Sequence, residues 1–327
     1  MRFSQDATGF NSVSFWSSQV KPVLSVSMKC RQSLVSLLSV IALVVMPHSA
    51  LRAQQAVKPS TKLSLWKVEG KTNAMYLLGS IHFLKKDFYP LPQPIEDAYK
   101  QAQVVVFEAD LGEMDSPETQ MKMLQSGKAP EGETLKDVLS KETYAKLESH
   151  LKESGLPIAV FDPLRPWMVA VALVSTEIMK LGYNPEEGVD KYFFGKLKKD
   201  TKELVALETL DFQLGLFTSL TKQEQDAMLR ETLQEISNFK KDLQGIIDAW
   251  KTGDTQALDK FMLEAMRDYP QLHKKLLIDR NKQWVDKLQK LHASGKRVFV
   301  VVGAAHLVGK DSVVDLLNAK GLKARQL

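Results

Sequence analysis

The chain has 327 residues, of which 44% are hydrophobic, 25% charged and 8% aromatic. This length and composition exclude a disordered or fibrous protein, and they suit one large domain or two smaller ones. The formal net charge is +5 at pH 7, and most of this basic excess lies near the N-terminal end.

Residues 1–53 have the pattern of a leader that includes a secretory signal peptide. A basic start at residues 28–31 precedes an apolar stretch at 34–46. This stretch of about 13 residues suits the hydrophobic region of a signal peptide and is short for a bilayer span. We expect a true start at Met28, cleavage after Ala53, and export to the periplasm or the extracellular space with no stable membrane span afterwards. An uncleaved membrane anchor is the alternative.

The leader also accounts for most of the charge excess and for the cysteine content. It holds five of the 44 Lys and Arg residues and one of the 39 Asp and Glu residues, which leaves a net charge of +1 for residues 54–327. No nucleic-acid partner is expected, because such a partner needs a basic face. Cys30 is the one cysteine of the chain. The remainder is therefore neither a thiol hydrolase nor a Cys-ligated zinc protein, and it suits an oxidising compartment.

The first elements after the leader are predicted to be strands. Residues 63–68 and 74–78 form a hairpin across a polar turn, and Gly79 ends the second strand. A helical stretch from residue 95 leads into residues 104–107. That short, fully apolar run is typical of a strand buried on both faces of a parallel sheet.

Residues 115–293 are mostly helical by the spacing of their apolar residues at three and four. A short strand at 203–206 interrupts them. A buried strand at 297–302, a helix at 312–319 and a last strand at 322–327 complete the chain. Within the middle region, helices are predicted at 134–154, 164–181, 189–200, 221–251, 254–266 and 270–293.

The two ends of the chain repeat one pattern of strand, Gly-x-x-His, loop, helix and strand, at 74–108 and again at 297–327. Two such units give parallel strands, and side chains just past the strand ends collect at one edge of the sheet. The predicted fold is α/β, with two repeated strand–GxxH–helix–strand halves that form a central, largely parallel sheet. Residues 54–327 make up a single domain, with a first half at 54–110, a large helical insertion at 111–293 and a second half at 294–327.

His82 and His306 end the two repeated motifs, so we expect them to lie side by side. Gly79 and Gly303 fit positions where a backbone leaves a strand with positive φ or passes close to a neighbour. A neutral imidazole can bind a metal ion or move a proton near neutral pH. The alternative for each histidine is a strand-end residue that is hydrogen-bonded to the backbone.

Glu108 and Glu208 each follow a predicted strand at the same edge of the sheet. Together with the two histidines they make a set of two nitrogen and two oxygen ligands, suited to Mn, Co or Zn and its ionised water. Alternatively, each glutamate caps a helix or pairs with an arginine. Arg280 and Asn281, inside the last long helix, could bind a carboxylate or an oxyanion, or have a surface or ion-pair role.

Several motifs resemble the TraB/GumN family, which is related to the Tiki metalloproteases and more distantly to erythromycin-esterase-like hydrolases. They are "LLGSIHFL", "VVFEAD", "LRPWMVAVAL", "GVDKYFFGKLKKDTKELVALET", "DRNKQWVDKL" and "VFVVVGAAHLVGKDSVVDLLNAKG". The resemblance covers residues 63–327. It implies a Tiki-like α/β fold made of two repeated halves around inserted helices. It also implies a divalent-metal-dependent hydrolase, with peptide cleavage as the activity associated with the Tiki branch.

The resemblance also implies roles for particular residues. The family's motifs fall on Gly79, His82, Glu108, Glu208, Arg280, Asn281, Gly303 and His306. Ser80 stands where the family more often has Thr. Asp279 stands where the family more often has Glu, which makes a metal-binding role for that acid less attractive.

Metal-assisted hydrolysis is the hypothesis that unites these residues. The two motif histidines and one or both of Glu108 and Glu208 hold a divalent cation, and a carboxylate helps to remove a proton from its bound water. Arg280 or Asn281 steadies the developing oxyanion. The partner is then a peptide or small-molecule substrate, and no pattern in the sequence indicates an oligomeric state.

Two other functions stay open. One is an exported peptide-binding or regulatory protein on the same scaffold, of the pheromone-shutdown or polysaccharide-export kind, without turnover. The other is a metal-independent esterase that uses a histidine as its base.

Overall fold

The computed structural model describes residues 62–70 and 73–327. The predicted leader, its cleavage after Ala53 and the start at Met28 lie outside these residues. In the described part of the chain, no helix has the length and apolar character needed to cross a membrane.

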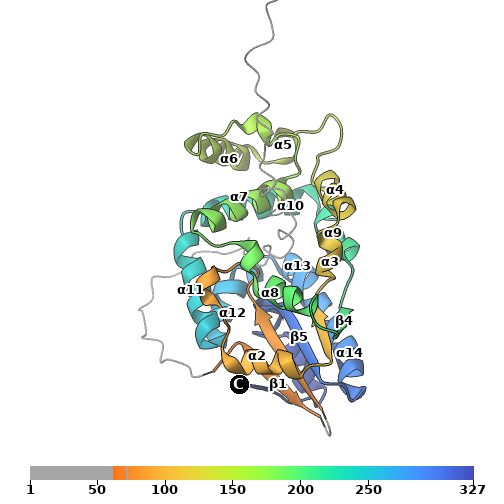
Figure 1. Cartoon of the computed structure of the whole chain (residues 1–327). Helices are drawn as coiled ribbons and strands as arrows, with labels where there is room; N and C mark the ends of the chain where they lie inside the picture. Colours follow the sequence, from red (N-terminus) through yellow and green to blue (C-terminus); the bar gives the residue numbers. More distant parts are fainter. Residues whose placement is uncertain (1–61, 71–72) are drawn as a thin grey trace, which may run out of the picture.

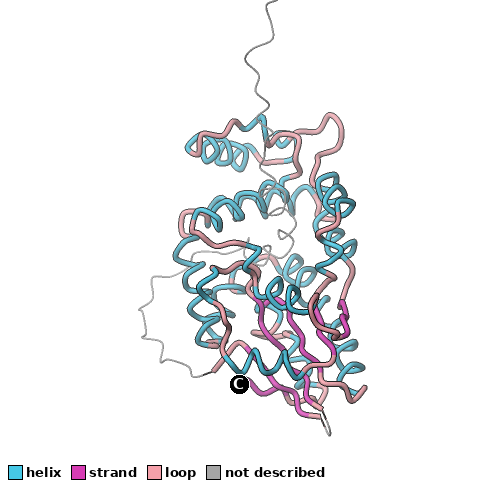
Figure 2. The backbone as a smooth tube through the Cα atoms, in the orientation of Figure 1, coloured by secondary structure: helices cyan, strands magenta, loops and turns pink. Residues whose placement is uncertain are grey.

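The sheet has six strands and lies in the lower part of the view in Figures 1 and 2, with many of the helices above it. The strands are β1 (Leu65–Glu69), β2 (Ala74–Ser80), β3 (Val104–Phe107), β4 (Glu203–Ala206), β5 (Val298–Gly303) and β6 (Ala324–Gln326). Their order in the sheet is β4-β3-β5-β2-β1-β6. β2, β5, β3 and β4 pair in parallel, whereas β1 is antiparallel to both β2 and β6. The predicted α/β class with a largely parallel sheet is confirmed.

The two predicted halves of the chain differ in how their strands are connected within the sheet. The connection from β2 to β3 passes over one strand of the sheet, β5, whereas the connection from β5 to β6 passes over two, β2 and β1. The exact repeat is therefore not confirmed. The strands that end in the two Gly-x-x-His motifs are nevertheless adjacent, because β2 and β5 are parallel neighbours with Ser80 opposite Gly303.

Burial along the strands explains their composition. Every residue of β3 and of β5 is buried, and both are rich in valine, which packs well on a pleated surface covered on both faces. β4 forms one edge of the sheet and is only partly buried. An aromatic cluster of Tyr99, Phe193 and Phe299 fastens two helices to β5, with ring centroids 5.0 to 5.8 Å apart.

Helices cover the sheet and extend beyond it. They are α2 (Gln93–Gln101), α3 (Leu111–Met114), α4 (Pro117–Ser126), α5 (Leu135–Val138), α6 (Lys141–Glu153), α7 (Pro166–Lys180), α8 (Val189–Leu197), α9 (Leu210–Thr218), α10 (Lys222–Glu235), α11 (Phe239–Thr252), α12 (Thr255–Leu263), α13 (Pro270–His273), α14 (Asp279–Ala293) and α15 (Val313–Ala319). The parallel strands point their carboxyl ends toward α7 and α10, which lie above the sheet in Figure 1.

Three predicted helices are interrupted. The stretch at 134–154 consists of α5 and α6, because Ser140 caps a new helix through the backbone N–H of Thr143. The stretch at 221–251 is divided into α10 and α11. The stretch at 270–293 contains a π-helical segment, Lys274–Ile278, between α13 and α14. Such π-helical turns change the direction in which the following side chains point.

Candidate functional site

Side chains from three strand ends meet beside Gly303, the last residue of β5. A Cβ atom placed on Gly303 would lie 3.2 Å from both Glu108 Oε1 and His82 Nε2, and 3.6 Å from Cδ2 of His306. The cause is the order of the strands, since β5 has β2 and β3 as its direct neighbours and parallel strands end at a common edge. The structure therefore brings His82, Glu108 and His306 together.

Glu108 follows β3 and is held by donors on both of its oxygens. The backbone N–H of Gly303 donates to Oε1 at 2.7 Å, and Arg280 Nη2 donates to Oε2 at 2.7 Å. Burial by itself would raise the pKa of this carboxyl. Arg280, followed by the two histidines, outweighs that effect and lowers the pKa to about 2. Glu108 is therefore a carboxylate at neutral pH.

Arg280 reaches this carboxylate from α14, and its side chain is only 9% exposed. Its Nη2 and Nε also donate to the carboxylate of Glu208, at 2.5 to 3.1 Å. Its Nη1 donates to the carbonyl oxygen of Leu276 at 2.9 Å and lies 3.2 Å from Nε2 of His306. A guanidinium presents its donors in a fixed plane, so this one side chain can fix the relative positions of two carboxylates and a histidine.

Glu208 follows β4 and accepts hydrogen bonds on both oxygens. Besides Arg280, its donors are Trp284 Nε1 at 3.0 Å and Gln213 Nε2 at 2.8 Å. Of the three roles considered for Glu208, namely metal ligand, helix cap and partner of an arginine, the contacts match the pairing with an arginine. Gln213 and Trp284 were not identified from the sequence, because a single amide or indole on a helix has no distinguishing pattern.

His306 ends the 3₁₀ turn Ala304–His306 that follows β5. Its Nδ1 lies 2.6 Å from Oδ1 of Asn281, and the amide nitrogen of Asn281 donates to the carbonyl oxygen of Asp311 at 2.9 Å. The amide oxygen must therefore accept from His306, which places the proton on Nδ1 and a lone pair on Nε2. Burial, with Arg280 as the next cause, lowers the pKa of His306 to about 3. This histidine is neutral near pH 7.

His82 follows β2 and has different surroundings. Its Nδ1 lies 3.2 Å from Oδ1 of Asp190, on α8. Burial alone would lower the pKa of His82, but the negative charges of Asp190 and Glu108 outweigh it and leave the pKa raised. The two motif histidines thus have pKa values shifted in opposite directions.

Asp190 was missed by the sequence analysis. It is the second residue of α8 and only 8% exposed. An acid in the first turn of a helix is usually a solvated residue that complements the helix dipole, so the residue type alone gave no signal. The signal that was available is the start of the helix, Gly188-Val189-Asp190, where an acid precedes a run of aromatic residues.

The motif glycines are explained by close approach. Neither Gly79 nor Gly303 has a positive φ. A Cβ on Gly79 would lie 3.2 Å from both Cα and Cβ of Ala304. Of the two reasons predicted for these glycines, the contact with a neighbouring segment is the one that applies.

Arg280 and Asn281 both contact the other site residues. The predicted oxyanion-binding role would need a free donor, whereas the donors of Arg280 contact Glu108, Glu208, Leu276 and His306, and Asn281 links His306 to Asp311. In this arrangement the two residues position the acid and the histidine.

The predicted metal set is not preformed in the structure. Within residues 62–70 and 73–327, no group of three or more His, Cys, Asp or Glu side chains is arranged to hold a metal ion. The donor types suit a divalent cation, but Arg280 contacts both His306 Nε2 and Glu108 Oε2, and Glu208 is saturated by donors. As arranged, these residues do not fit a resident cation.

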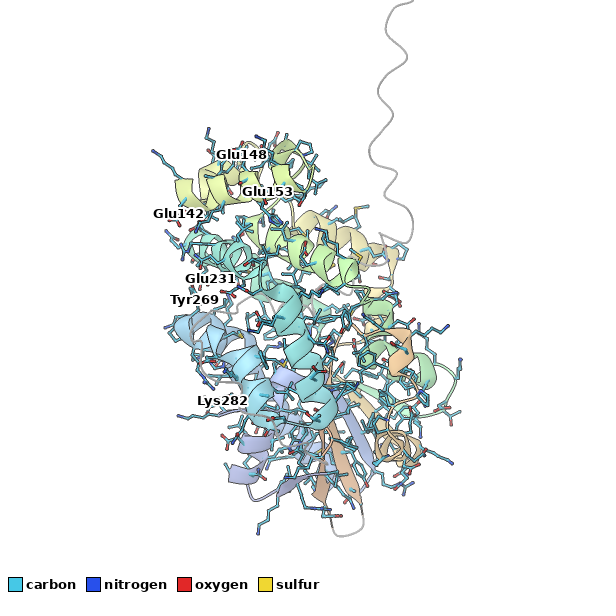
Figure 3. All side chains as sticks on the ribbon, turned by 90° about the vertical axis from the view of Figure 1, so that its left-hand side faces the viewer. Glu142, Glu148, Glu153, Glu231, Tyr269 and Lys282 are labelled. Atoms are coloured by element: carbon cyan, nitrogen blue, oxygen red, sulfur yellow. The ribbon has the colours of Figure 1, made fainter. Side chains whose placement is uncertain are left out.

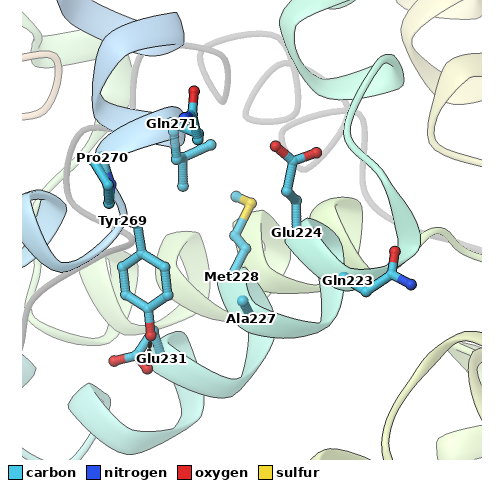
Figure 4. A pocket seen from close by; sticks show the side chains of 9 residues that line it. Gln223, Glu224, Ala227, Met228, Glu231, Tyr269, Pro270 and Gln271 are labelled. Carbon is cyan, nitrogen blue, oxygen red and sulfur yellow. Dashed lines mark hydrogen bonds between the residues drawn. The ribbon is translucent and has the colours of Figure 1, made fainter.

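A separate hollow lies between α10 and α13, with a volume of about 280 Å³ (Figure 4). Its walls are mostly apolar and include Met228 and Leu272, and the hydroxyl of Tyr269 donates to Glu231 at its side. Figure 3 shows Glu231 and Tyr269 on one side of the molecule, between the acidic residues of α6 and Lys282 on α14. None of the predicted site residues lines this hollow.

The amino-acid sequence is similar to that of known proteins over most of its length. A model of the TraB/PrgY/gumN family matches residues 64–326. No solved structure matches the chain.

Two kinds of relative are found among curated proteins. The uncharacterized protein YbaP of Escherichia coli (strain K12) is 27% identical over 270 residues, which cover 83% of this chain and 96% of YbaP. Metalloprotease TIKI1 of Danio rerio is 24% identical over 311 residues, covering 79% of this chain and 61% of that protein. Metalloprotease TIKI1 of Xenopus tropicalis is 20% identical over 310 residues, covering 79% and 60%.

Proposed function

The chain belongs to the TraB/PrgY/gumN family, and we propose that it is a hydrolase whose reaction centre lies beside Gly303. The observation that carries the proposal is the convergence of His82 Nε2, Glu108 Oε1 and the ring of His306 on this glycine. Two histidines with opposite pKa shifts and an ionised carboxylate form the kind of group that transfers protons in hydrolysis.

His82 is the proton carrier in this proposal. Its side chain is 14% exposed, against 5% for His306, and the lone pair of His306 already faces Arg280 at 3.2 Å. Nε2 of His82 takes a proton from the attacking water as the new C–O bond forms. It then returns that proton to the leaving group as the scissile bond breaks.

Glu108 and Arg280 support this proton transfer without titrating. Glu108 stays ionised and stabilises the positive charge that His82 acquires. Arg280 fixes the carboxylate through Nη2, and His306 fixes Arg280 in turn. An arrangement held by buried ion pairs needs little reorganisation when charge develops.

A peptide is the substrate class that we propose first, because two of the relatives carry the name metalloprotease. Dependence on a divalent cation is a narrower proposal with the same support. A bound cation would supply a Lewis acid and lower the pKa of water. In the arrangement described, Arg280 would first have to release His306 and Glu108, and no step proposed for the residues of this chain depends on the cation.

Metal-independent hydrolysis is the second candidate. The observation that favours it is the guanidinium of Arg280, which already brings a buried positive charge to Glu108 and His306. Esters and lactones are then substrates to test beside peptides. Export, predicted from residues 1–53, is proposed for either candidate.

The test is a cleavage assay with a peptide library and a panel of esters, run with added Mn²⁺ or Co²⁺ and with a chelator. We expect products from the wild-type chain and none from His82→Ala at equal folded concentration. Loss of products with the chelator supports the metal-dependent form, and their persistence supports the metal-independent one. Absence of products from folded wild-type protein under all these conditions contradicts the proposal.

A further inference from the structure

The two Gly-x-x-His motifs differ at their second position, and the structure shows the consequence. The first motif has Ser80 and the second has Ala304. The hydroxyl of Ser80 donates to Oδ1 of Asp190 at 3.1 Å, and the same oxygen lies 3.2 Å from Nδ1 of His82. His306 instead has the neutral amide of Asn281 at its Nδ1. One histidine of the pair is backed by a charge and the other is not.

The start of α8 is built to bring Asp190 to this position. The backbone N–H of Val189 donates to the carbonyl oxygen of Ile81 at 3.0 Å. Gly188 permits the approach, since a Cβ there would lie 2.5 Å from the carbonyl oxygen of His82 and 2.9 Å from Oδ1 of Asp190. The start of α8 therefore packs directly against the backbone of Ile81 and His82 in the first motif.

The contact between His82 and Asp190 matters for the site because both side chains are largely buried. The side chains of His82 and Asp190 are 14% and 11% exposed, and a buried carboxylate is costly unless it is paired. His82 Nδ1 is buried and has no well-aligned hydrogen-bond partner among the described residues, so Asp190 is the acceptor within reach. The other charged groups that act on His82 are Glu108 and Arg280.

We propose that Asp190 is the positioning residue of the reaction centre. It holds His82 with the proton on Nδ1 and the lone pair on Nε2, the nitrogen that faces Gly303. Ser80 orients Asp190 by donating to the same oxygen. The inference rests on the proposed function for its catalytic consequence, but the placement of the proton holds for the folded chain with no substrate present. Carboxylates that orient a reactive histidine act in this way because they fix both the ring and its tautomer.

The direct test is nitrogen NMR of the histidine-labelled chain at a pH where His82 is neutral. Signals of His82 are assigned by their loss in His82→Gln. We expect wild-type His82 to carry its proton on Nδ1, and we expect Asp190→Ala to give a mixture of the two tautomers. Ser80→Ala should move the equilibrium in the same direction by a smaller amount, whereas Ser80→Thr, which keeps the hydroxyl, should match the wild type.

Asp226→Ala is the matched control, because Asp226, on α10, is equally buried but accepts hydrogen bonds from the backbone N–H of Ser140 and from Arg230. Its loss should leave the His82 tautomer unchanged. A proton on Nε2 in wild-type His82 overturns the inference without any variant. An unchanged tautomer in both Asp190→Ala and Ser80→Ala overturns it as well.

Kinetics give the second readout once a substrate is in hand. We expect Asp190→Asn to lower kcat by about 10- to 100-fold, by analogy with the loss of a hydrogen-bond partner behind a metal-bound histidine, with KM nearly unchanged. Ser80→Thr should retain activity. Wild-type kcat in folded Asp190→Asn contradicts the positioning role. This result leaves the hydrolase proposal intact. An inactive wild-type chain whose His82 carries its proton on Nδ1 would instead contradict the hydrolase proposal and leave the inference about the tautomer in place.

Discussion

Arg280 Nη1 lies 3.2 Å from Nε2 of His306, so a fixed positive charge contacts a ring nitrogen of one of the two histidines that were predicted to bind a metal ion. The same guanidinium bonds to Glu108 and Glu208. Three of the four predicted ligands therefore share one arginine as their partner.

The first prediction concerns the stability that Arg280 provides. Arg280→Gln leaves two buried carboxylates without their partner, so the free energy of unfolding should fall by about 3 to 5 kcal/mol. Urea denaturation measures this change. Arg267→Gln is the control, because Arg267 pairs with Asp259 at the surface with half of its side chain exposed, and it should lose less than about 1 kcal/mol. Equal effects in the two variants would contradict the structural role given to Arg280.

The second prediction concerns competition between Arg280 and a cation. If Arg280 holds the positions that a cation would need, Mn²⁺ should raise the melting temperature of Arg280→Gln more than that of the wild type, since a ligand stabilises the state it binds. Adding His306→Ala to Arg280→Gln should remove this gain. Tight stoichiometric Mn²⁺ binding to the wild type that disappears in Arg280→Gln would mean that Arg280 supports the cation.

The third prediction concerns acid stability. The pKa of Glu108 is lowered to about 2 from an ordinary value of 4.5. The unfolded chain therefore binds this proton more readily than the folded chain does, and the stabilisation is present above pH 4.5 and lost as the pH falls toward 2. Between pH 6 and pH 3, the wild type should lose more unfolding free energy than Glu108→Gln. Glu203→Gln, an exposed acid on β4, should follow the wild type.

The fourth prediction concerns the two histidines. His306, with its pKa lowered to about 3 by burial and by Arg280, should not titrate between pH 5 and 8, whereas His82 should titrate with a midpoint above 6.5. The lowered pKa of His306 reduces stability as the pH falls from 6.5 toward 3. The raised pKa of His82 adds stability as the pH falls toward 6.5, and this contribution is fully present below that value. NMR titration of the histidine rings measures both. Coincident midpoints would show that the two environments are equivalent.

The fifth prediction separates the two motif glycines. A Cβ on Gly303 would come within 3.2 Å of Glu108 Oε1 and His82 Nε2, whereas one on Gly79 would meet Cα and Cβ of Ala304. Gly303→Ala should therefore displace reactive side chains and abolish most activity with little change in melting temperature. Gly79→Ala should mainly lower the melting temperature, because the backbone of Ala304 is less able to move away from the added methyl group than a side chain is. A reversed pattern would contradict the placement of the reaction centre beside Gly303.

The sequence indicated the strand ends well because their signals are local. Apolar runs that stop at Gly79 and Gly303 predicted β2 and β5, and parallel pairing then put His82 and His306 at one edge of the sheet. Glu108 followed from the same rule. What the sequence did not contain is the order of the strands, in which β5 separates β2 from β3.

The partners of these residues were harder to predict, because they come from helices distant in the sequence. Periodicity predicted Arg280 inside the last long helix, but it did not say whether the side chain is buried or which carboxylates it meets. The π-helical segment before α14 also changes the direction of its face. Asp190 had the pattern of an ordinary first-turn acid, and only the docking of α8 on the backbone at Ile81 reveals its contact with His82.

Hydrolysis by wild-type protein and by Glu108→Gln, on the first substrate that the library yields, tests the central claim most directly. The substitution keeps the shape of the side chain and removes the charge that supports His82. We predict that Glu108→Gln, folded and at equal concentration, loses nearly all turnover while Glu203→Gln retains it. Equal turnover by Glu108→Gln and the wild type would contradict a reaction centre beside Gly303.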